Sequence, residues 1–234
     1  MIKTAIVLAG GFGTRLQTVV KDVPKPMALV NGKPFLQYAL GYLQHQRMER
    51  CLLAVGYKWE MIEKFFGSRF ESMTLEYVVE KEPLGTGGAI AAAARMGGEE
   101  EYFVVNGDTL FTIDLEKFYA RHESANAELS LALKPMHNFD RYGVVRKNAG
   151  ERITSFEEKK FYREGNINGG IYVLVASLLD EIAMPEKFSF EKDLLEPFCS
   201  SRRFFGFPCN DYFIDIGIPE DYERAQSELD AFAY

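Results

Sequence analysis

The chain has 234 residues, of which 47% are hydrophobic and 26% charged, the composition of an ordinary folded protein rather than a disordered one. Its 34 Asp and Glu residues outweigh 27 Lys and Arg residues, which argues against nucleic acid as a partner because binding to a phosphate backbone needs a basic face. The three widely spaced cysteines disfavour a disulfide framework or a zinc site, and no apolar run is long enough for a transmembrane helix or a signal peptide. We therefore expect a cytoplasmic protein that binds no membrane.

Short apolar runs alternate with helical patterns in the first half of the chain. We expect strands at residues 6–9, 52–55, 75–79 and 102–106, and helices at residues 34–47, 59–66 and 86–96. This alternation is typical of a mostly parallel sheet covered by helices, so we predict an α/β fold.

The second half has more strands with shorter connections. We expect strands at residues 129–133, 143–146, 153–156, 170–175 and 213–215, and helices at residues 177–182, 190–198 and 219–231. Because no linker or low-complexity segment separates the halves, residues 1–234 are interpreted as a single domain.

The first expected strand runs directly into a glycine-rich segment, Leu8-Ala9-Gly10-Gly11-Phe12-Gly13-Thr14-Arg15-Leu16. Glycines at this place let the backbone approach a base or a phosphate, and their N–H groups can bind an anion. The segment is not a P-loop, which ends in Gly-Lys-Ser/Thr, nor a dinucleotide fingerprint, which needs a glycine at position 16. A tight turn without a ligand is the alternative that the glycines alone leave open.

A lysine braced by two prolines follows in the segment Val23-Pro24-Lys25-Pro26-Met27. The prolines predict a stiff, extended backbone around Lys25. The planar guanidinium of Arg15 can donate two parallel hydrogen bonds, and the ammonium of Lys25 is a compact positive charge. Both groups suit the binding of a polyphosphate.

Together these two segments resemble the signature of the sugar-phosphate nucleotidyltransferases, in which Leu-Ala-Gly-Gly-x-Gly-Thr-Arg-Leu precedes Pro-Lys-Pro-Met. Further matches follow in order at residues 82–89, 106–108, 142–145, 156–159, 168–172 and 213–222. The resemblance implies a Rossmann-like three-layer sandwich with a mixed, mostly parallel central sheet. It also implies transfer of a nucleotidyl group from a nucleoside triphosphate to a sugar 1-phosphate. Residues 1–110 would form the nucleotide-binding half and residues 111–234 the sugar-phosphate-binding half.

The resemblance also implies a nucleotide site with Arg15 and Lys25 as its catalytic residues. Its other binding residues would be Leu8, Ala9, Gly10, Gly11, Gly13, Thr14, Glu80, Gly85, Thr86 and Asp108. Residue 80 lies at the base edge in the family, and the carboxylate of Glu80 can accept from both N1–H and the amino group of guanine. Glu82 in the same short run is a competing candidate.

Two aspartates stand at the ends of expected strands, Asp108 and Asp215. Such residues are often helix caps or turn formers, but two of them can also share one Mg²⁺ that bridges phosphates. Both match the metal-binding aspartates of the family, so the resemblance implies Mg²⁺ as the cofactor.

For the sugar phosphate, the resemblance implies that Lys159 contacts the phosphate and Glu158 a sugar hydroxyl. The other expected sugar-phosphate-binding residues are Asn106, Gly143, Asn168 and Gly169. Lys160 stands where relatives commonly have Pro. The alternative for this segment is a run of charged residues that is exposed to solvent and binds no ligand.

The remaining candidates are interpreted as structural. The three histidines, His45, His122 and His137, show neither ligand spacing nor an acid–base partner, so we expect them at the surface or in satisfied core positions. The aromatic residues Phe204, Phe205 and Phe207 are expected in the core.

Within the family, several segments are most similar to guanylyltransferases that act on D-glycero-α-D-manno-heptose 1-phosphate for bacterial surface polysaccharides, which implies GTP as the nucleotide. Mannose 1-phosphate guanylyltransferases and glucose 1-phosphate thymidylyl- or uridylyltransferases are the alternatives. A glycosyltransferase would need Asp-x-Asp where the chain has Asn106-Gly107-Asp108, and a non-catalytic regulatory relative would be expected to lack Arg15, Lys25 or an aspartate. Members of the family are often oligomeric, but the apolar pattern picks out no interface.

Overall fold

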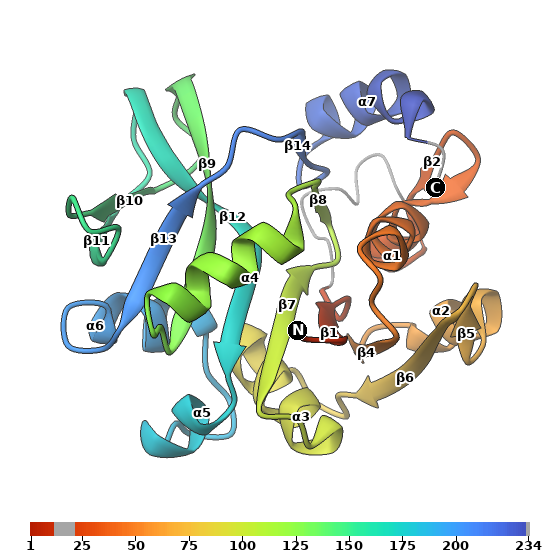
Figure 1. The fold of residues 1–234 in the computed structure, drawn as a ribbon. Coiled ribbons are helices and arrows are strands. Elements are labelled where there is room, and N and C mark those ends of the chain that lie inside the picture. The colour runs from red at the N-terminus through yellow and green to blue at the C-terminus, as the bar shows by residue number, and fades with distance from the viewer. Residues whose placement is uncertain (12–21, 233–234) are drawn as a thin grey trace.

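A computed structural model describes residues 1–11 and 22–232 (Figure 1). In this part of the chain, eight strands form one main sheet in the order β13-β9-β12-β7-β1-β4-β6-β5. The strands are β1 (Thr4–Leu8), β4 (Arg50–Val55), β5 (Arg69–Phe70), β6 (Met73–Val79), β7 (Glu101–Asn106), β9 (Leu129–Phe139), β12 (Tyr162–Val175) and β13 (Phe204–Pro208). Strands β7, β1, β4 and β6 are parallel, whereas β12 is antiparallel to both of its neighbours, so the sheet is mixed, as expected.

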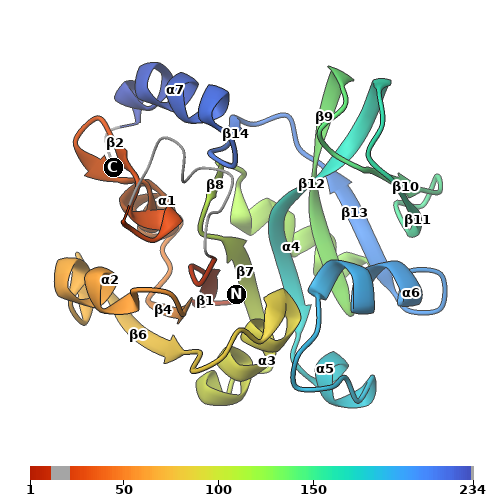
Figure 2. The same ribbon diagram turned by 180° about the vertical axis from the view of Figure 1, so that it is seen from behind.

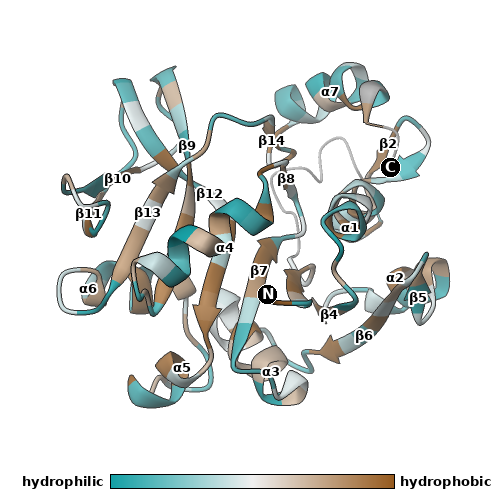
Figure 3. Ribbon diagram, viewed as in Figure 1, coloured by the Kyte–Doolittle hydropathy of each residue, from teal (hydrophilic) through white to brown (hydrophobic). Residues whose placement is uncertain are grey.

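Helices cover both faces of the sheet (Figures 1 and 2). One face carries α1 (Phe35–His45), α2 (Trp59–Phe66), α4 (Leu115–Ser124) and α7 (Pro219–Glu228). The other carries α3 (Gly85–Gly97), α5 (Ser177–Glu181), the π-helix η2 (Phe190–Leu195) and α6 (Glu196–Phe198). Figure 3 shows the hydrophobic residues concentrated in the strands between these layers.

Alternation along the central strands divides the core into two clusters. Ala5 and Val7 of β1 pack with the cluster on one face, while Ile6 packs with the cluster on the other. This is the two-residue period of a strand that is buried on both sides, and it confirms the expected three-layer arrangement.

Several elements differ from the sequence-based expectations. Strands β9 and β12 have 11 and 14 residues and pair from Tyr162 opposite Phe139 to Leu174 opposite Leu129, and we call this pair the β9–β12 arm. Its outer half extends beyond the neighbouring strands β7 and β13 of the main sheet. The outer half of this arm lacks the apolar run that marked the inner half. The expected helix at residues 190–198 is a π-helix followed by the short α6.

Helix α4 was not among the helices expected from the sequence. Asp114 caps it by accepting from the N–H of Lys117 at 3.0 Å, and Leu115, Phe118 and His122 form its buried side. Both signals, an aspartate at the N-cap and apolar residues at helical spacing, are present in the sequence.

Two short strands bring distant segments to one place. Strand β14 (Phe213–Asp215) pairs antiparallel with β8 (Thr109–Phe111), so that Asp215 lies opposite Thr109. A separate hairpin, β10 (Val144–Lys147) with β11 (Ile153–Glu157), lies beside the β9–β12 arm. Short strands β2 (Leu29–Val30) and β3 (Lys33–Pro34) form a third small pair.

The residues expected to be structural behave as such. His122 is buried, with its Nδ1 2.8 Å from the hydroxyl oxygen of Ser130, and His45 and His137 are exposed. Phe204 and Phe207 are buried in the core, and Phe205 packs partly buried against it. Of the helices in residues 1–11 and 22–232, none is both long enough and apolar enough to span a bilayer.

Candidate active site

The carboxyl ends of parallel strands open into a cavity of about 290 Å³, which we call the first cavity. Strands β1, β4, β6 and β7 run in the same direction, so the residues at their carboxyl ends gather at one edge of the sheet. The lining residues are Leu8, Gly10, Gly11, Lys25, Pro26, Ala54, Glu80, Pro83, Gly85, Thr86, Ala89, Asn106, Asp108 and Glu191.

Most of the expected nucleotide-binding residues therefore line one cavity, although they come from five separate segments. Ala9 differs, because it is buried in the core and its N–H donates to Ala54 O at 2.8 Å. Gly13, Thr14 and Arg15 lie outside the described residues.

Two glycines allow the chain segments around the first cavity to approach closely. A Cβ atom on Gly10 would lie 2.9 Å from Oε1 of Glu80, and one on Gly107 would lie 2.6 Å from the carbonyl oxygen of Leu8. Neither distance is compatible with a larger residue without a shift of backbone or side chain. The glycines thus bring the end of β1 against both Glu80 and the segment that carries Asp108.

Lys25 forms the centre of a charge cluster at one end of this cavity. Its Nζ lies 2.5 Å from Oδ2 of Asp108 and 3.8 Å from Oδ1 of Asp215, and the lysine side chain is only 11% exposed. The backbone is not extended at Lys25 as expected, because the residue opens a 3-10 turn, η1 (Lys25–Met27), and only Pro24 before it is extended. Proline still has a part in this geometry, because Pro26 fits the first turn of a helix, where its missing N–H costs nothing.

Asp215 is held by a donor on each of its oxygens. The N–H of Gly217 donates to Oδ1 at 2.7 Å, and the hydroxyl of Tyr142 donates to Oδ2 at 3.2 Å. Burial raises the pKa of Asp215, the nearby charge of Asp108 raises it further, and Lys25 acts in the opposite direction. Two mutually repelling carboxylates are thus fixed side by side and share one cation.

This pair fits a magnesium ion that takes the rest of its ligands from phosphates. In the described part of the chain, no group of three or more His, Cys, Asp or Glu side chains is placed to hold a metal. Mg²⁺ does not need such a cage, because it commonly binds one or two carboxylates together with phosphate oxygens and water. Asp108 and Asp215 supply that minimal set.

A second cavity of about 500 Å³ adjoins the first and shares Asn106 and Glu191 with it. It lies between the β9–β12 arm, the β10–β11 hairpin and helix η2. Among its lining residues are Asn106, Gly143, Glu158, Lys159, Asn168, Gly169 and Asp215. All the expected sugar-phosphate-binding residues therefore line this second cavity.

The walls and the rim of the second cavity are built differently. Asn168 is held on both sides, since its Nδ2 donates to the Tyr172 hydroxyl at 2.8 Å and its Oδ1 accepts from the N–H of Gly170 at 3.1 Å. Glu158 and Lys159, in contrast, are exposed at the start of the loop that follows β11. The wall is preorganised by hydrogen bonds, whereas the charged rim is exposed to solvent.

The structure separates the two candidates for the base edge. Glu80 lines the first cavity and accepts from the N–H of Leu84 at 2.9 Å, and burial raises its pKa while that hydrogen bond lowers it. Glu82 is exposed and is not among the residues that line the cavity. The geometry favours Glu80.

Glu191 is a lining residue that sequence reasoning missed. It lies in the π-helix η2, and its Oε2 accepts from the hydroxyl of Thr86 at 2.9 Å and from that of Ser189 at 3.3 Å. A π-turn cannot be read from residue spacing, and Thr86 and Glu191 are 105 residues apart in the chain. The sequence signal was limited to the similarity of the surrounding segment to guanylyltransferases.

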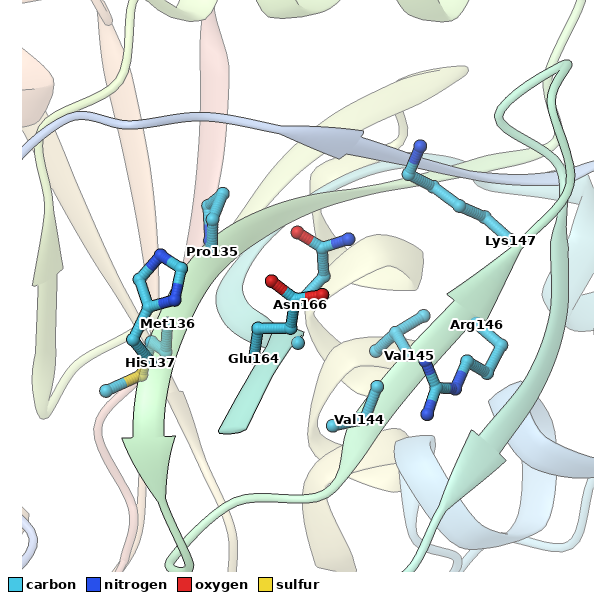
Figure 4. A pocket seen from close by; sticks show the side chains of 10 residues that line it. Pro135, Met136, His137, Val144, Val145, Arg146, Lys147, Glu164 and Asn166 are labelled. Atoms are coloured by element: carbon cyan, nitrogen blue, oxygen red, sulfur yellow. The ribbon is translucent and has the colours of Figure 1, made fainter. Parts of the chain in front are cut away.

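A further cavity of about 380 Å³ lies away from the strand ends. Figure 4 shows it between Pro135, Met136 and His137 of β9 and the β10 residues, with Glu164 and Asn166 of β12 between them. The two basic side chains that line it, Arg146 and Lys147, are ion-paired with Glu157 and Glu151. These pairs make the cavity a poor site for a phosphate.

Comparison with known proteins agrees with this geometry. Residues 4–231 match the family model described as Nucleotidyl transferase. The chain is 50% identical, over 96% of its length and 97% of the relative, to a D-glycero-α-D-manno-heptose 1-phosphate guanylyltransferase of Aneurinibacillus thermoaerophilus. It is 47% identical, over 93% of its length and 96% of the relative, to the enzyme of the same name from Campylobacter jejuni.

Solved structures show the same fold. The crystal structure of HddC from Yersinia pseudotuberculosis has a TM-score of 0.88 and 36% identity, and covers 97% of this chain and 100% of its own. A second structure of HddC is complexed with GMP-PN and has a TM-score of 0.87. The expected fold is therefore confirmed, and the chain belongs to the nucleotidyl transferase family.

Proposed function

We propose that this chain transfers GMP from GTP to D-glycero-α-D-manno-heptose 1-phosphate and releases pyrophosphate. The observation that carries the proposal is the pair of adjoining cavities, which meet beside a cluster of one lysine and two aspartates. Two substrate-sized cavities with a cation site at their junction suit a reaction between two phosphorylated substrates. The names of the relatives at 50% and 47% identity support the choice of heptose and guanine.

Recognition of guanine is assigned to Glu80. Its carboxylate stands at the end of the first cavity, beside Gly10, and can accept from N1–H and the amino group of guanine together. Thymine and uracil offer no such pair of donors. The GMP-PN complex of HddC supports a guanine nucleotide in this fold.

The chemistry needs positioning and charge neutralisation more than acid–base catalysis. A sugar phosphate is already an anion at neutral pH, so no general base has to generate the nucleophile. The barrier comes from bringing two polyanions together and from charge at the α-phosphorus, which aligned cations reduce. We assign Lys25 to the α-phosphate region, Lys159 to the incoming sugar phosphate and, outside the described residues, Arg15 to the departing pyrophosphate.

Asp108 and Asp215 would hold Mg²⁺, which would supply positive charge against the phosphates of the nucleotide. The Lys25 ammonium already lies between these aspartates, so the two carboxylates are oriented for a cation before any substrate arrives. Asn106, Gly143, Asn168 and Gly169 would form the walls that orient the sugar, with Glu158 accepting from a hydroxyl.

The test is release of pyrophosphate by the purified chain with a panel of nucleoside triphosphates and sugar 1-phosphates in the presence of Mg²⁺. We expect the highest kcat/KM for GTP with the heptose phosphate. A preference for mannose 1-phosphate, or for dTTP or UTP, would replace the substrate assignment by one of the alternatives within the family. GTP binding without pyrophosphate release for any sugar phosphate would defeat the enzymatic proposal.

A further inference from the structure

Glu191 is the charged residue that the two cavities share. It lines both of them together with the neutral Asn106. Its position depends on helix η2, whose π-turn is capped by the hydroxyl of Ser189, which accepts from the N–H of Lys192 at 3.2 Å. Turns of this kind are uncommon and occur often at functional sites.

The carboxylate is held in place by hydroxyl groups. Thr86 on α3 donates to Glu191 Oε2 and in turn accepts from the N–H of Phe190 at 2.9 Å. On the other side, burial and then the charge of Glu191 raise the pKa of Tyr172, whose hydroxyl accepts from Asn168. Glu191 is thus fixed between the opening of α3 and the wall of the second cavity.

A carboxylate in this place does not suit a phosphate. It adds negative charge near Asp108 and Asp215, where two polyanions are expected to bind. Its acceptor oxygens instead suit a hydroxyl donor, and both substrates carry hydroxyls on a ring next to their phosphate. A nucleotide with its base at Glu80 and its phosphates at Lys25 would place its ribose between Glu80 and Lys25, in the cavity that Glu191 also lines.

We propose that Glu191 accepts a hydrogen bond from a ring hydroxyl of a bound substrate at the junction of the two cavities, and so determines specificity for a hydroxylated ring. This rests on the proposed function, because it requires a nucleotide in the first cavity and a sugar phosphate in the second. The hydroxyl comes from the ribose or from the sugar, and the two sources are distinguished by deoxy analogues.

The experiment compares Glu191→Gln and Glu191→Ala with the wild type, using GTP, 2′-deoxy-GTP and 3′-deoxy-GTP. If Glu191 binds a ribose hydroxyl, both variants should lower kcat/KM for GTP about 10- to 100-fold, which is the effect of losing a hydrogen bond to a charged acceptor. The variants should leave kcat/KM unchanged for the deoxy nucleotide that lacks this hydroxyl. If Glu191 instead binds a hydroxyl of the sugar 1-phosphate, the same pattern should appear with deoxy analogues of that substrate. Equal losses with every analogue, or no loss, would overturn the proposal.

Asp193→Asn is the matched control. It removes one negative charge from the same helix, at a residue that accepts from the N–H of Ser189 at 2.7 Å and lines neither cavity. It should leave the discrimination between hydroxyl and deoxy substrates unchanged. If the wild type shows no turnover, the proposed function fails, and the same comparison is made by calorimetric binding of GTP and its deoxy analogues.

Discussion

The two cavities of the site differ in how they are built. The first lies at the carboxyl ends of parallel strands in the middle of the sheet, and its charged centre is a largely buried lysine between two aspartates. The second lies beside an antiparallel arm and a separate hairpin, and the charged residues at its rim, Glu158 and Lys159, are exposed.

Because of this difference, we expect the two cavities to contribute differently to turnover and to substrate binding. Charges in a partly buried, preorganised site interact strongly, because the local dielectric constant is low and the groups already point at one another. Exposed charges are screened and contribute less. Changes in the first cavity should therefore reduce turnover strongly, and changes at the rim of the second should mainly weaken binding of one substrate.

The largest effect is expected at Lys25. Lys25→Gln keeps a donor for Asp108 but removes the positive charge, so kcat should fall roughly 10²- to 10³-fold. Steady-state kinetics checks this, with thermal unfolding to confirm that the variant is folded and the exposed Lys33→Gln as control. Wild-type turnover in folded Lys25→Gln would refute a central role for the buried cluster.

Glu80→Gln should change base preference. With the carboxylate neutralised, the ratio of kcat/KM for GTP to that for dTTP should fall about 10- to 100-fold, because a charged acceptor for two guanine donors is lost. Glu82→Gln, on an exposed side chain of the same segment, should leave the ratio as it is. An unaltered ratio in Glu80→Gln would remove Glu80 from base recognition.

Tyr142→Phe tests the support of Asp215 from the side of the second cavity. Loss of the hydroxyl that donates to Asp215 Oδ2 should raise the Mg²⁺ concentration needed for half-maximal activity roughly 2- to 10-fold. Titration of activity with Mg²⁺ measures the shift. Tyr212→Phe, which removes a hydrogen bond to Glu228 outside both cavities, should show none, and an equal shift in the two variants would mean a general loss of stability.

The smallest effect is expected at the exposed rim. Lys159→Ala should raise the KM for the sugar phosphate by at most about 5-fold with little change in kcat, since an exposed ion pair contributes little. Its neighbour Lys160 is also exposed and is not among the lining residues, so Lys160→Ala serves as control. A large loss of kcat in Lys159→Ala would contradict the contrast between the two cavities.

The sequence predicted the parts of this site that depend on local chemistry. Gly10 and Gly11 directly follow a strand, and Lys25, Asp108 and Asp215 stand in motifs whose spacing is recognisable. The gathering of Gly10, Gly11 and Asp108 at one edge followed from the parallel strands β1 and β7, because such strands carry their ligands at the carboxyl ends. Asp215 reaches the same place by a different route, through the antiparallel pairing of β14 with β8.

Features that depend on long-range packing were not predictable. The contact of Glu191 with Thr86 needs a π-turn, and the hydrogen bond from Tyr142 to Asp215 joins residues 73 positions apart. The outer part of the β9–β12 arm is held by pairing between its strands and by a small apolar cluster of Phe139, Tyr162 and Ile167 with Val144. These apolar residues are too widely spaced along the chain to mark a strand.

If the two cavities hold both substrates at once, transfer of the nucleotidyl group occurs in one step. The most direct test is the stereochemical course at phosphorus, followed with GTPαS of one configuration and the heptose 1-phosphate. A single in-line displacement predicts inversion at the α-phosphorus in the product. Retention would indicate two displacements through a covalent enzyme intermediate and would contradict the account.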